Sequence, residues 1–287
     1  IFTLSWEAEK LINYLDLFYS KIEKELNVNF HQKIDIYKIL VNDDEVNLWK
    51  KKANEYSQFM DSHIYYLNNN EFLKENAGYA RVLNSGYINT NIFINESTNY
   101  FKKLNKYKNK KINYSDINTI KNNNNIILFA EGYKAINNPY FPEIQLKLAK
   151  GEILDIKINN FNIDYIISKN LFLFPQGNNI YTIGATFEWD FEDNKPTEKQ
   201  KDILIENLKK FLNVDFEVVC QKAGIRPSSI DRRPILGNSS LDENIYILNG
   251  MGAKAVMLAP YSSQILLDNI IKNVEIPNEL NYNRFIN

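Results

Sequence analysis

The chain has 287 residues, of which 44% are hydrophobic and 13% aromatic, so it can build a sizeable core in one large or two medium domains. Its net charge of −1 and pI near 6.3 exclude a bulk electrostatic attraction to nucleic acid or to an anionic membrane. A single cysteine excludes an internal disulfide, and with only two histidines no metal site is expected.

Three further features bear on location and partners. The sequence has neither a run of 18 apolar residues nor a secretory signal, so we expect a cytoplasmic protein with no membrane span. Cys220 lies in a strand-like stretch and is expected to be a buried, inert thiol. The Lys-rich run 101–111 is interpreted as a solvated helix end and linker rather than a binding arm, and no nucleic-acid partner is expected.

The first half of the chain predicts helices separated by short strands. Apolar residues at three- and four-residue spacing predict an amphipathic helix over 7–26. Asn42-Asp-Asp-Glu45 has the pattern of a capping box and predicts a helix to about Tyr56. The other elements expected here are a strand over 34–41, an irregular stretch or short helix over 65–76, a turn and strand at 86–89, and a helix over 92–104.

The middle of the chain predicts a strand that leads into strand hairpins. Ile126-Ile-Leu-Phe129 is short and fully apolar, as in a strand buried on both faces of a parallel sheet, and it ends in Ala130-Glu131-Gly132. A small residue, an acid and a glycine at the end of a strand allow a close approach to a cofactor. Further strands are expected at 150–158, 171–174 and 180–189, with a turn at 175–179.

The last third predicts two helices and two strands. Thr197-x-x-Gln200 is a second capping box and predicts a helix carrying Leu204 and Leu208. Strands are expected at 216–219 and 244–248, and Pro260 is expected in the first turn of a helix that ends near Ile271. The order of these elements indicates an α/β layer interrupted by an antiparallel sheet.

The most informative stretch is Gly224-Ile-Arg-Pro227, followed by Pro234-Ile-Leu-Gly237 and then by the small-residue loop Gly250-Met-Gly-Ala-Lys254. With these segments the chain resembles the D-amino-acid-oxidase family of FAD-dependent oxidoreductases, which includes glycine oxidase. Three more segments resemble the family in the same order: Phe129-Ala-Glu-Gly132, Lys150-Gly-Glu152 and Tyr181-Thr-Ile-Gly-Ala-Thr186.

The resemblance implies two domains. One is an FAD-binding α/β domain (Rossmann-like) formed by residues 1–30, 85–142 and 223–287. The other is a substrate domain with a mainly antiparallel sheet, formed by residues 31–84 and 143–222. The family's opening strand and G-x-G-x-x-G loop, which hold the FAD pyrophosphate, have no counterpart in this sequence. We therefore expect an incomplete FAD-binding domain, in which the strands at 126–129 and 245–248 lack their middle partner and leave apolar edges.

Arg226 is the leading candidate for catalysis, because its guanidinium can hold a substrate carboxylate through two parallel hydrogen bonds. The alternative is a structural arginine paired with Asp231 or with a carbonyl. By resemblance, a second set of residues would contact the flavin, with tight turns or plain packing as the alternative. This set comprises Glu131, Gly132, Gly250, Met251, Gly252, Ala253 and Lys254.

The substrate pocket is expected to involve Tyr181, Thr186 and Trp189, although aromatic residues on strands more often lie in a core. Ala253 stands where some amine oxidases of the family carry arginine, so their amino-acid specificity is not carried over.

The function implied is FAD-dependent oxidation of an amine or amino-acid-like small molecule, with hydride passing to the flavin. Two alternatives to this function remain open. In the first, the chain is a truncated, non-catalytic remnant. In the second, it is one part of a split enzyme that is completed by a separate nucleotide-binding polypeptide in trans.

Overall fold

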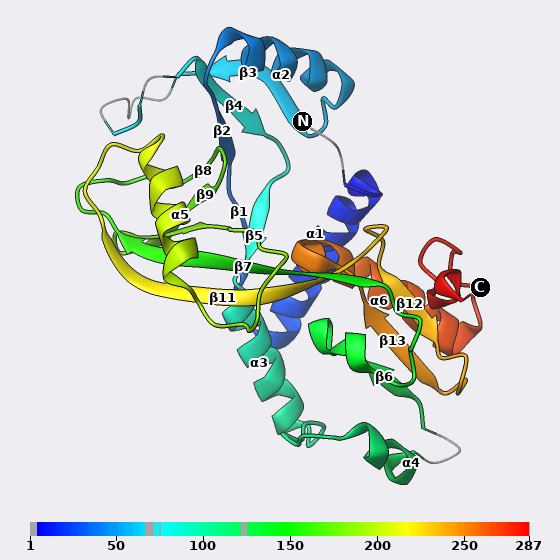
Figure 1. Cartoon of the computed structure of the whole chain (residues 1–287). Coiled ribbons are helices and arrows are strands. Elements are labelled where there is room, and N and C mark those ends of the chain that lie inside the picture. Colours follow the sequence, from blue (N-terminus) through cyan, green and yellow to red (C-terminus); the bar gives the residue numbers. More distant parts are fainter. Residues whose placement is uncertain (1–4, 67–71, 75, 122–124, 287) are drawn as a thin grey trace. The chain divides into compact units, whose positions relative to one another are not determined.

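The computed structural model describes residues 5–66, 72–74, 76–121 and 125–286, and part of the irregular stretch expected at 65–76 lies outside these residues. The chain forms two compact units and passes between them more than once (Figure 1). The first unit contains Gln32–Tyr87 and Lys150–Gly224. The second contains the described parts of Thr3–His31, Ile88–Ala149 and Ile225–Asn287.

The first unit is built on a mixed sheet of eight strands in the order β11-β7-β10-β9-β8-β2-β4-β3. Most neighbours are antiparallel, and β2 pairs with β8 in parallel. The strands β7 and β11 extend past the boundary of the unit. The strands are β2 (Ile36–Leu40), β3 (Met60–Tyr65), β4 (Gly78–Val82), β7 (Leu146–Lys157), β8 (Ile166–Ser168), β9 (Phe172–Gly177), β10 (Ile180–Gly184) and β11 (Glu217–Ser229).

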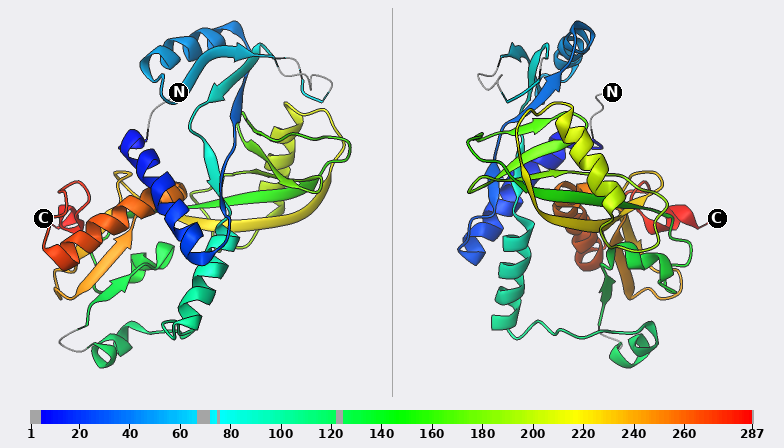
Figure 2. Two further views of the ribbon diagram at one scale, coloured as in Figure 1. Left: turned by 180° about the vertical axis from the view of Figure 1, so that it is seen from behind. Right: turned by 60° about the vertical axis from the view of Figure 1, so that its left-hand side comes forward.

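The core of the first unit lies between this sheet and helix α5 (Glu198–Lys209), which crosses one face of the sheet (Figure 2). Alternate residues of a strand point to the same face, and on β7 Leu154 and Ile156 are fully buried in this core. Leu204 and Leu208 of α5 pack against the same cluster. The second helix of the unit is α2 (Asp43–Glu55).

The second unit combines helices with a small sheet in the order β12-β13-β6. Helix α1 (Ala8–Leu26) packs on α6 (Ala255–Lys272), and the Tyr19 hydroxyl donates to the Val256 carbonyl at 2.8 Å. The remaining elements here are α3 (Thr90–Lys103), η1 (Tyr114–Asp116), α4 (Ile117–Ile120), β6 (Ile127–Phe129), η2 (Gly132–Asn137), β12 (Ile235–Asn238), β13 (Ile245–Asn249), η3 (Gly252–Lys254) and η4 (Tyr282–Phe285). A two-stranded pair, β1 (His31–Lys33) and β5 (Gly86–Ile88), lies where the chain passes between the units.

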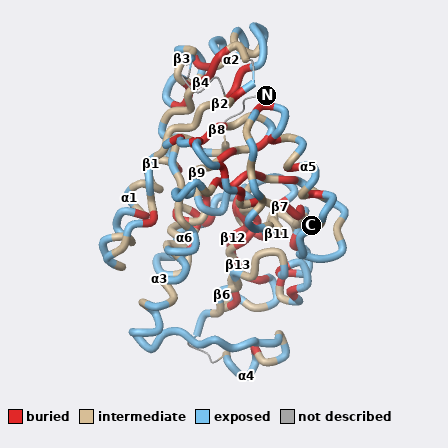
Figure 3. The backbone as a smooth tube through the Cα atoms, turned by 90° about the vertical axis from the view of Figure 1, so that its left-hand side faces the viewer, coloured by how far each residue is buried: buried red, intermediate tan, exposed pale blue. Residues whose placement is uncertain are grey.

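The helix predictions are confirmed where capping and periodicity were the signal. The Asn42 side chain accepts from the Glu45 amide at 2.9 Å, and the Thr197 hydroxyl caps α5. The expected hairpin is also present, because β9 and β10 pair across Asn178 and Asn179, which both have positive φ. Figure 3 shows buried residues concentrated along the strands, whereas the link from α3 to α4 is exposed.

Three predictions about strands and a thiol are wrong. The strand β6 is not buried on both faces: it pairs with β13 alone among the described residues, and Leu128 is 46% exposed. The strand β13 does have partners on both sides, so of the two strands expected to lack a partner only β6 lies at an edge of this sheet. Cys220 is exposed, because it lies on β11 at the edge of the large sheet.

Two boundaries also differ from the sequence predictions. Helix α6 begins at Ala255, so Pro260 lies inside the helix rather than at its start. Because Pro260 still lies near the beginning of the helix, its missing amide removes one early hydrogen bond and the helix continues. The strand expected to run to Trp189 ends at Gly184, and Glu188 makes an isolated bridge to Lys150 instead.

Candidate functional site

Two loops of the second unit meet beyond the ends of neighbouring parallel strands. The strand β6 leads to Glu131 and Gly132, and β13 leads to the loop that starts at Gly250. Buried Asn249 joins the two, since its side-chain amide donates to the Gly132 carbonyl at 2.9 Å. Its side-chain oxygen accepts from the Gly250 amide at 2.8 Å. The carboxyl ends of parallel strands are where open α/β sheets bind ligands, and here both loops are fixed by one side chain.

Glycines let the loop at 250–252 pack closely on β11 and β12. Gly132, Gly250 and Gly252 all have positive φ, at 60°, 79° and 54°, a region that residues with a Cβ enter only with strain. A Cβ on Gly252 would overlap the Ser228 hydroxyl, and one on Gly250 would crowd Ile235. A Cβ on Gly132 would meet nothing within 4 Å, so the backbone there faces open space. The loop at 250–252 is therefore tightly packed, whereas the loop after β6 is open at Gly132.

The loop runs directly into the N-terminus of α6. Ala253 and Lys254 are exposed, and no side chain in the described part of the chain caps the first turn of this helix. Uncapped amides and the helix dipole together favour an electronegative group at this point. The Lys254 ammonium donates to the Ser5 hydroxyl at 2.8 Å, which holds a positive charge beside the same helix end.

Glu131 is held by two neutral donors. The Tyr114 hydroxyl donates to one carboxylate oxygen at 2.9 Å, and the Asn138 side-chain amide donates to the other at 2.7 Å. Burial raises the pKa of Tyr114 to about 12, and its hydrogen bond to Glu131 adds to the effect. The carboxylate thus anchors the loop after β6 to the segment around Tyr114, and the fixed loop presents the backbone of Gly132.

Arg226 lies on β11, two residues before Ser228, whose backbone bridges Met251. Burial lowers the pKa of the Arg226 guanidinium, which marks a partly dehydrated cation. Asp231, the alternative partner considered from the sequence, instead accepts from Arg284 at 2.7 Å and 3.2 Å. Burial of the Asp231 carboxyl raises its pKa, but hydrogen bonds from Arg284 and the Arg233 amide outweigh this, and the net pKa is lowered.

The three residues expected to line a substrate pocket all belong to the first unit and have different surroundings. Tyr181 is 3% exposed, and its hydroxyl donates to the Phe161 carbonyl at 2.5 Å within the core. Thr186 is buried, and its hydroxyl accepts from the Glu152 amide at 2.9 Å. Trp189 is 53% exposed. Burial favours a packing role for the first two, and Trp189 alone of the three is open to a ligand.

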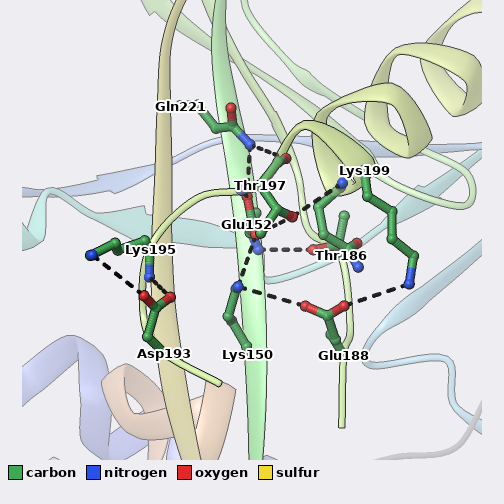
Figure 4. Close-up of polar contacts among 10 residues, drawn as sticks. Lys150, Glu152, Thr186, Glu188, Asp193, Lys195, Thr197, Lys199 and Gln221 are labelled. Carbon is green, nitrogen blue, oxygen red and sulfur yellow. Dashed lines mark hydrogen bonds and ion pairs between the residues drawn. The ribbon is translucent and has the colours of Figure 1, made fainter. Parts of the chain in front are cut away.

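Thr186 borders a buried network of charges that the sequence analysis did not identify (Figure 4). The Glu152 carboxylate accepts from the Thr197 amide at 3.0 Å and from the Gln221 side chain at 2.7 Å. The Lys150 ammonium lies 3.4 Å from Glu152 and 3.7 Å from Glu188. The side chains of Lys150 and Glu152 are only 3% and 0% exposed, so the network ties β7 to the start of α5.

Asn249 and Ser228 are the other residues that the sequence analysis missed. A polar residue at the end of an apolar strand and directly before a glycine was the available signal for Asn249. No local pattern marks Ser228, because its role depends on a bridge to Met251, which is distant in the sequence.

Comparisons with known proteins identify a family and a fold. The model of the family described as FAD dependent oxidoreductase (DAO) matches residues 116–269. A glycine oxidase from Bacillus cereus superposes with a TM-score of 0.76 at 15% identity, covering 96% of this chain and 83% of that one. An iminodiacetate oxidase from Chelativorans superposes with a TM-score of 0.73 at 12% identity, covering 94% and 82%. At such identities, these two structures show the shared fold.

A curated protein from Idiomarina loihiensis is also similar to this chain. It is named tRNA 5-methylaminomethyl-2-thiouridine biosynthesis bifunctional protein and is 28% identical over 99 residues. The match covers 33% of this chain and 16% of that protein, so the chain spans a small part of the relative's length. In the described part of the chain, no helix is long and apolar enough to cross a membrane.

Proposed function

The chain belongs to the family of FAD-dependent oxidoreductases, and we propose that it oxidises the carbon beside an amine nitrogen. Bound FAD supplies the two-electron acceptor for the hydride that leaves this carbon. The nitrogen lone pair forms the imine as the hydride leaves, and a proton is released from the nitrogen. Water then hydrolyses the imine, and an external electron acceptor such as oxygen restores the cofactor.

The observation that carries this proposal is the pair of loops joined by Asn249. Open space at Gly132, the close backbone turn at Gly252 and the uncapped start of α6 fit a flat, electronegative ring system. In this proposal Gly250, Met251 and Gly252 present main-chain atoms to the flavin. Lys254 and the helix N-terminus would stabilise negative charge on a bound flavin ring, and the small side chain of Ala253 would leave the approach unobstructed. Glu131 holds the opposite loop in place through its two hydrogen bonds.

Arg226 is proposed to bind and orient the substrate. A partly dehydrated guanidinium interacts more strongly with a carboxylate than an exposed one does, and two parallel hydrogen bonds fix the substrate's orientation. Trp189 is the pocket residue whose exposure supports contact with substrate. Tyr181 and Thr186 would then shape the pocket indirectly, by packing behind it.

The substrate class has two candidates. An amine or amino acid of small size fits Arg226 as a carboxylate clamp. The name of the Idiomarina relative supports a second candidate, an aminomethyl group carried on a uridine of tRNA. The same bond is broken in both, because each offers a carbon beside an amine nitrogen. A tRNA substrate also fits the cytoplasmic location that the sequence predicts.

We also propose that the free edge of β6 accepts a strand from a nucleotide-binding segment outside this sequence, on the same or a separate polypeptide. Among the described residues β6 has one partner, and its Leu128 is 46% exposed. A parallel strand here would cover this edge and place a pyrophosphate-binding loop beside Gly132. A non-catalytic remnant is the rival, and it predicts no flavin binding.

Anaerobic mixing tests the proposal directly. The chain is reconstituted with FAD and mixed with glycine, iminodiacetate, or tRNA bearing an aminomethyl uridine. We expect at least one of them to bleach the visible flavin absorbance. Arg226→Leu should raise the concentration of a carboxylate substrate that is needed for half-maximal bleaching, while FAD stays bound. Arg226→Lys should reverse part of this increase. An FAD-loaded chain that none of these compounds bleaches contradicts the proposed function.

A further inference from the structure

The strongest unassigned feature of the second unit is the stretch from Phe101 to Asn113, here called the Lys-rich segment. It contains six lysines, and between Glu96 and Asp116 the sequence has no acidic residue. The lysines are Lys102, Lys103, Lys106, Lys108, Lys110 and Lys111. The whole chain carries a net charge of only −1, which predicts no anionic partner. Positive charge is nevertheless concentrated locally in the Lys-rich segment.

Every residue of the Lys-rich segment is exposed. Elsewhere, many lysines neutralise nearby carboxylates, as Lys222 does with Asp155 and Lys272 with Asp268. Within the described residues, the six lysines of the segment make no ion pair, and Lys102 lies over the Tyr107 ring instead. Their charges therefore face solvent without a neutralising partner in the described part of the chain.

The segment also exposes large apolar and aromatic side chains between its lysines. Phe101 is 46% exposed, Tyr107 41% and Ile112 51%. A purely solvated linker has no need of such side chains, whereas single-stranded nucleic acid stacks its bases on aromatic rings and pairs its phosphates with lysines. From Lys106 to Asn113 the backbone has no regular structure, so its side chains can follow an irregular phosphate path.

Both ends of the segment are anchored, and one of them reaches the candidate flavin site. At the first end, the Tyr100 hydroxyl donates to Glu25 of α1 at 2.8 Å. Just beyond the other end, the Tyr114 hydroxyl donates to Glu131, which holds the loop of Gly132. Ile117 follows in the buried core of the second unit. A polyanion on the segment would thus lie next to Tyr114, whose hydroxyl is bonded to Glu131 in the loop after β6.

We propose that the Lys-rich segment binds the phosphate backbone of a tRNA and so delivers a base-linked amine to the flavin site. This rests on the second substrate candidate of the proposed function, and it revises the interpretation of residues 101–111 as a solvated linker. Phosphate contacts position a nucleic acid without reading its sequence. The selection of the modified base would then fall to the site itself.

The test is the affinity for fluorescently labelled tRNA, measured by anisotropy at several salt concentrations. The test variant carries Lys106→Gln, Lys108→Gln, Lys110→Gln and Lys111→Gln. The control variant removes the same charge from other exposed lysines, with Lys50→Gln, Lys51→Gln, Lys209→Gln and Lys210→Gln. If each of the four lysines neutralises one phosphate, the slope of log affinity against log salt should become shallower by about 3. The control should keep the wild-type slope.

Three results would overturn the proposal: a wild-type chain that does not bind tRNA, equal slopes in the two variants, or binding to vesicles of anionic lipid in place of tRNA. A parallel FAD titration separates this inference from the proposed function. The lysine variant should bind FAD as the wild type does. Flavin binding and oxidation of free amines without tRNA binding would refute only the inference, and lysine-dependent tRNA binding without flavin binding would refute the oxidoreductase function.

Discussion

Replacing Glu152 by glutamine should destabilise the first unit by about 3–5 kcal/mol, the range for removing one partner of a buried ion pair. The Glu152 side chain is 0% exposed and faces the Lys150 ammonium at 3.4 Å, while Lys150 itself is 3% exposed. The variant leaves this ammonium with Glu188 at 3.7 Å as its remaining ion-pair partner. It also places an amide donor among the amides of Thr197 and Gln221, which both donate to the carboxylate.

The assay is urea denaturation followed by tryptophan fluorescence, since buried Trp49 reports on the first unit. Glu198→Gln is the matched control, because Glu198 is 80% exposed and its pair with Lys201 lies on the surface. That control should change stability by less than about 1 kcal/mol. Adding Lys150→Met to Glu152→Gln should restore part of the loss, with a coupling of about 1–3 kcal/mol. The reasoning would be refuted if Glu152→Gln lost no more stability than Glu198→Gln, or if the effects of Glu152→Gln and Lys150→Met were strictly additive.

Three further predictions concern single side chains. Asp231→Asn should lower stability at neutral pH, because Arg284 loses its carboxylate. The pKa of Asp231 is lower in the folded state than the unfolded value of 3.8, so the stability that its carboxylate contributes is present above pH 3.8 and is lost as pH falls through the folded-state pKa. The stabilities of the wild type and of Asp231→Asn should therefore converge as pH falls below 3.8. A stability difference that does not change with pH would contradict this. Exposed Cys220 should react fully with a thiol reagent in the native state, whereas a thiol that reacts only after denaturation would refute its placement. Asn249→Ala should weaken FAD binding at least tenfold (about 1.4 kcal/mol), because the buried tie to the Gly132 carbonyl is lost; an unchanged FAD titration would count against the role of the paired loops.

Local sequence signals predicted the elements that depend on local chemistry. The caps at Asn42 and Thr197 fixed the starts of two helices, because each side chain bonds an amide three residues ahead. The glycines of the 250–252 loop were identified mainly through the family resemblance, and their positive φ values are ones that glycine adopts without strain. Such features need no knowledge of distant parts of the chain.

The features that sequence reasoning missed depend on long-range pairing. Periodicity showed that β6 is apolar, but its neighbours in the sheet decide its burial, and it has one described partner. Cys220 was expected to be buried because β11 has strand-like composition, whereas its edge position leaves it exposed. The network at Glu152 joins residues 45 and 69 positions away, so no local pattern could indicate it.

The most direct test of the central claim is an FAD titration of the purified chain, followed by the change in the visible flavin spectrum. We predict saturable binding that Gly252→Ala weakens strongly, because the added Cβ would overlap the Ser228 hydroxyl in a loop with positive φ. Gly224→Ala is the control, since a Cβ there meets nothing within 4 Å. A folded chain whose titration shows no binding, or equal binding by both variants, would contradict the assignment of these loops to the flavin.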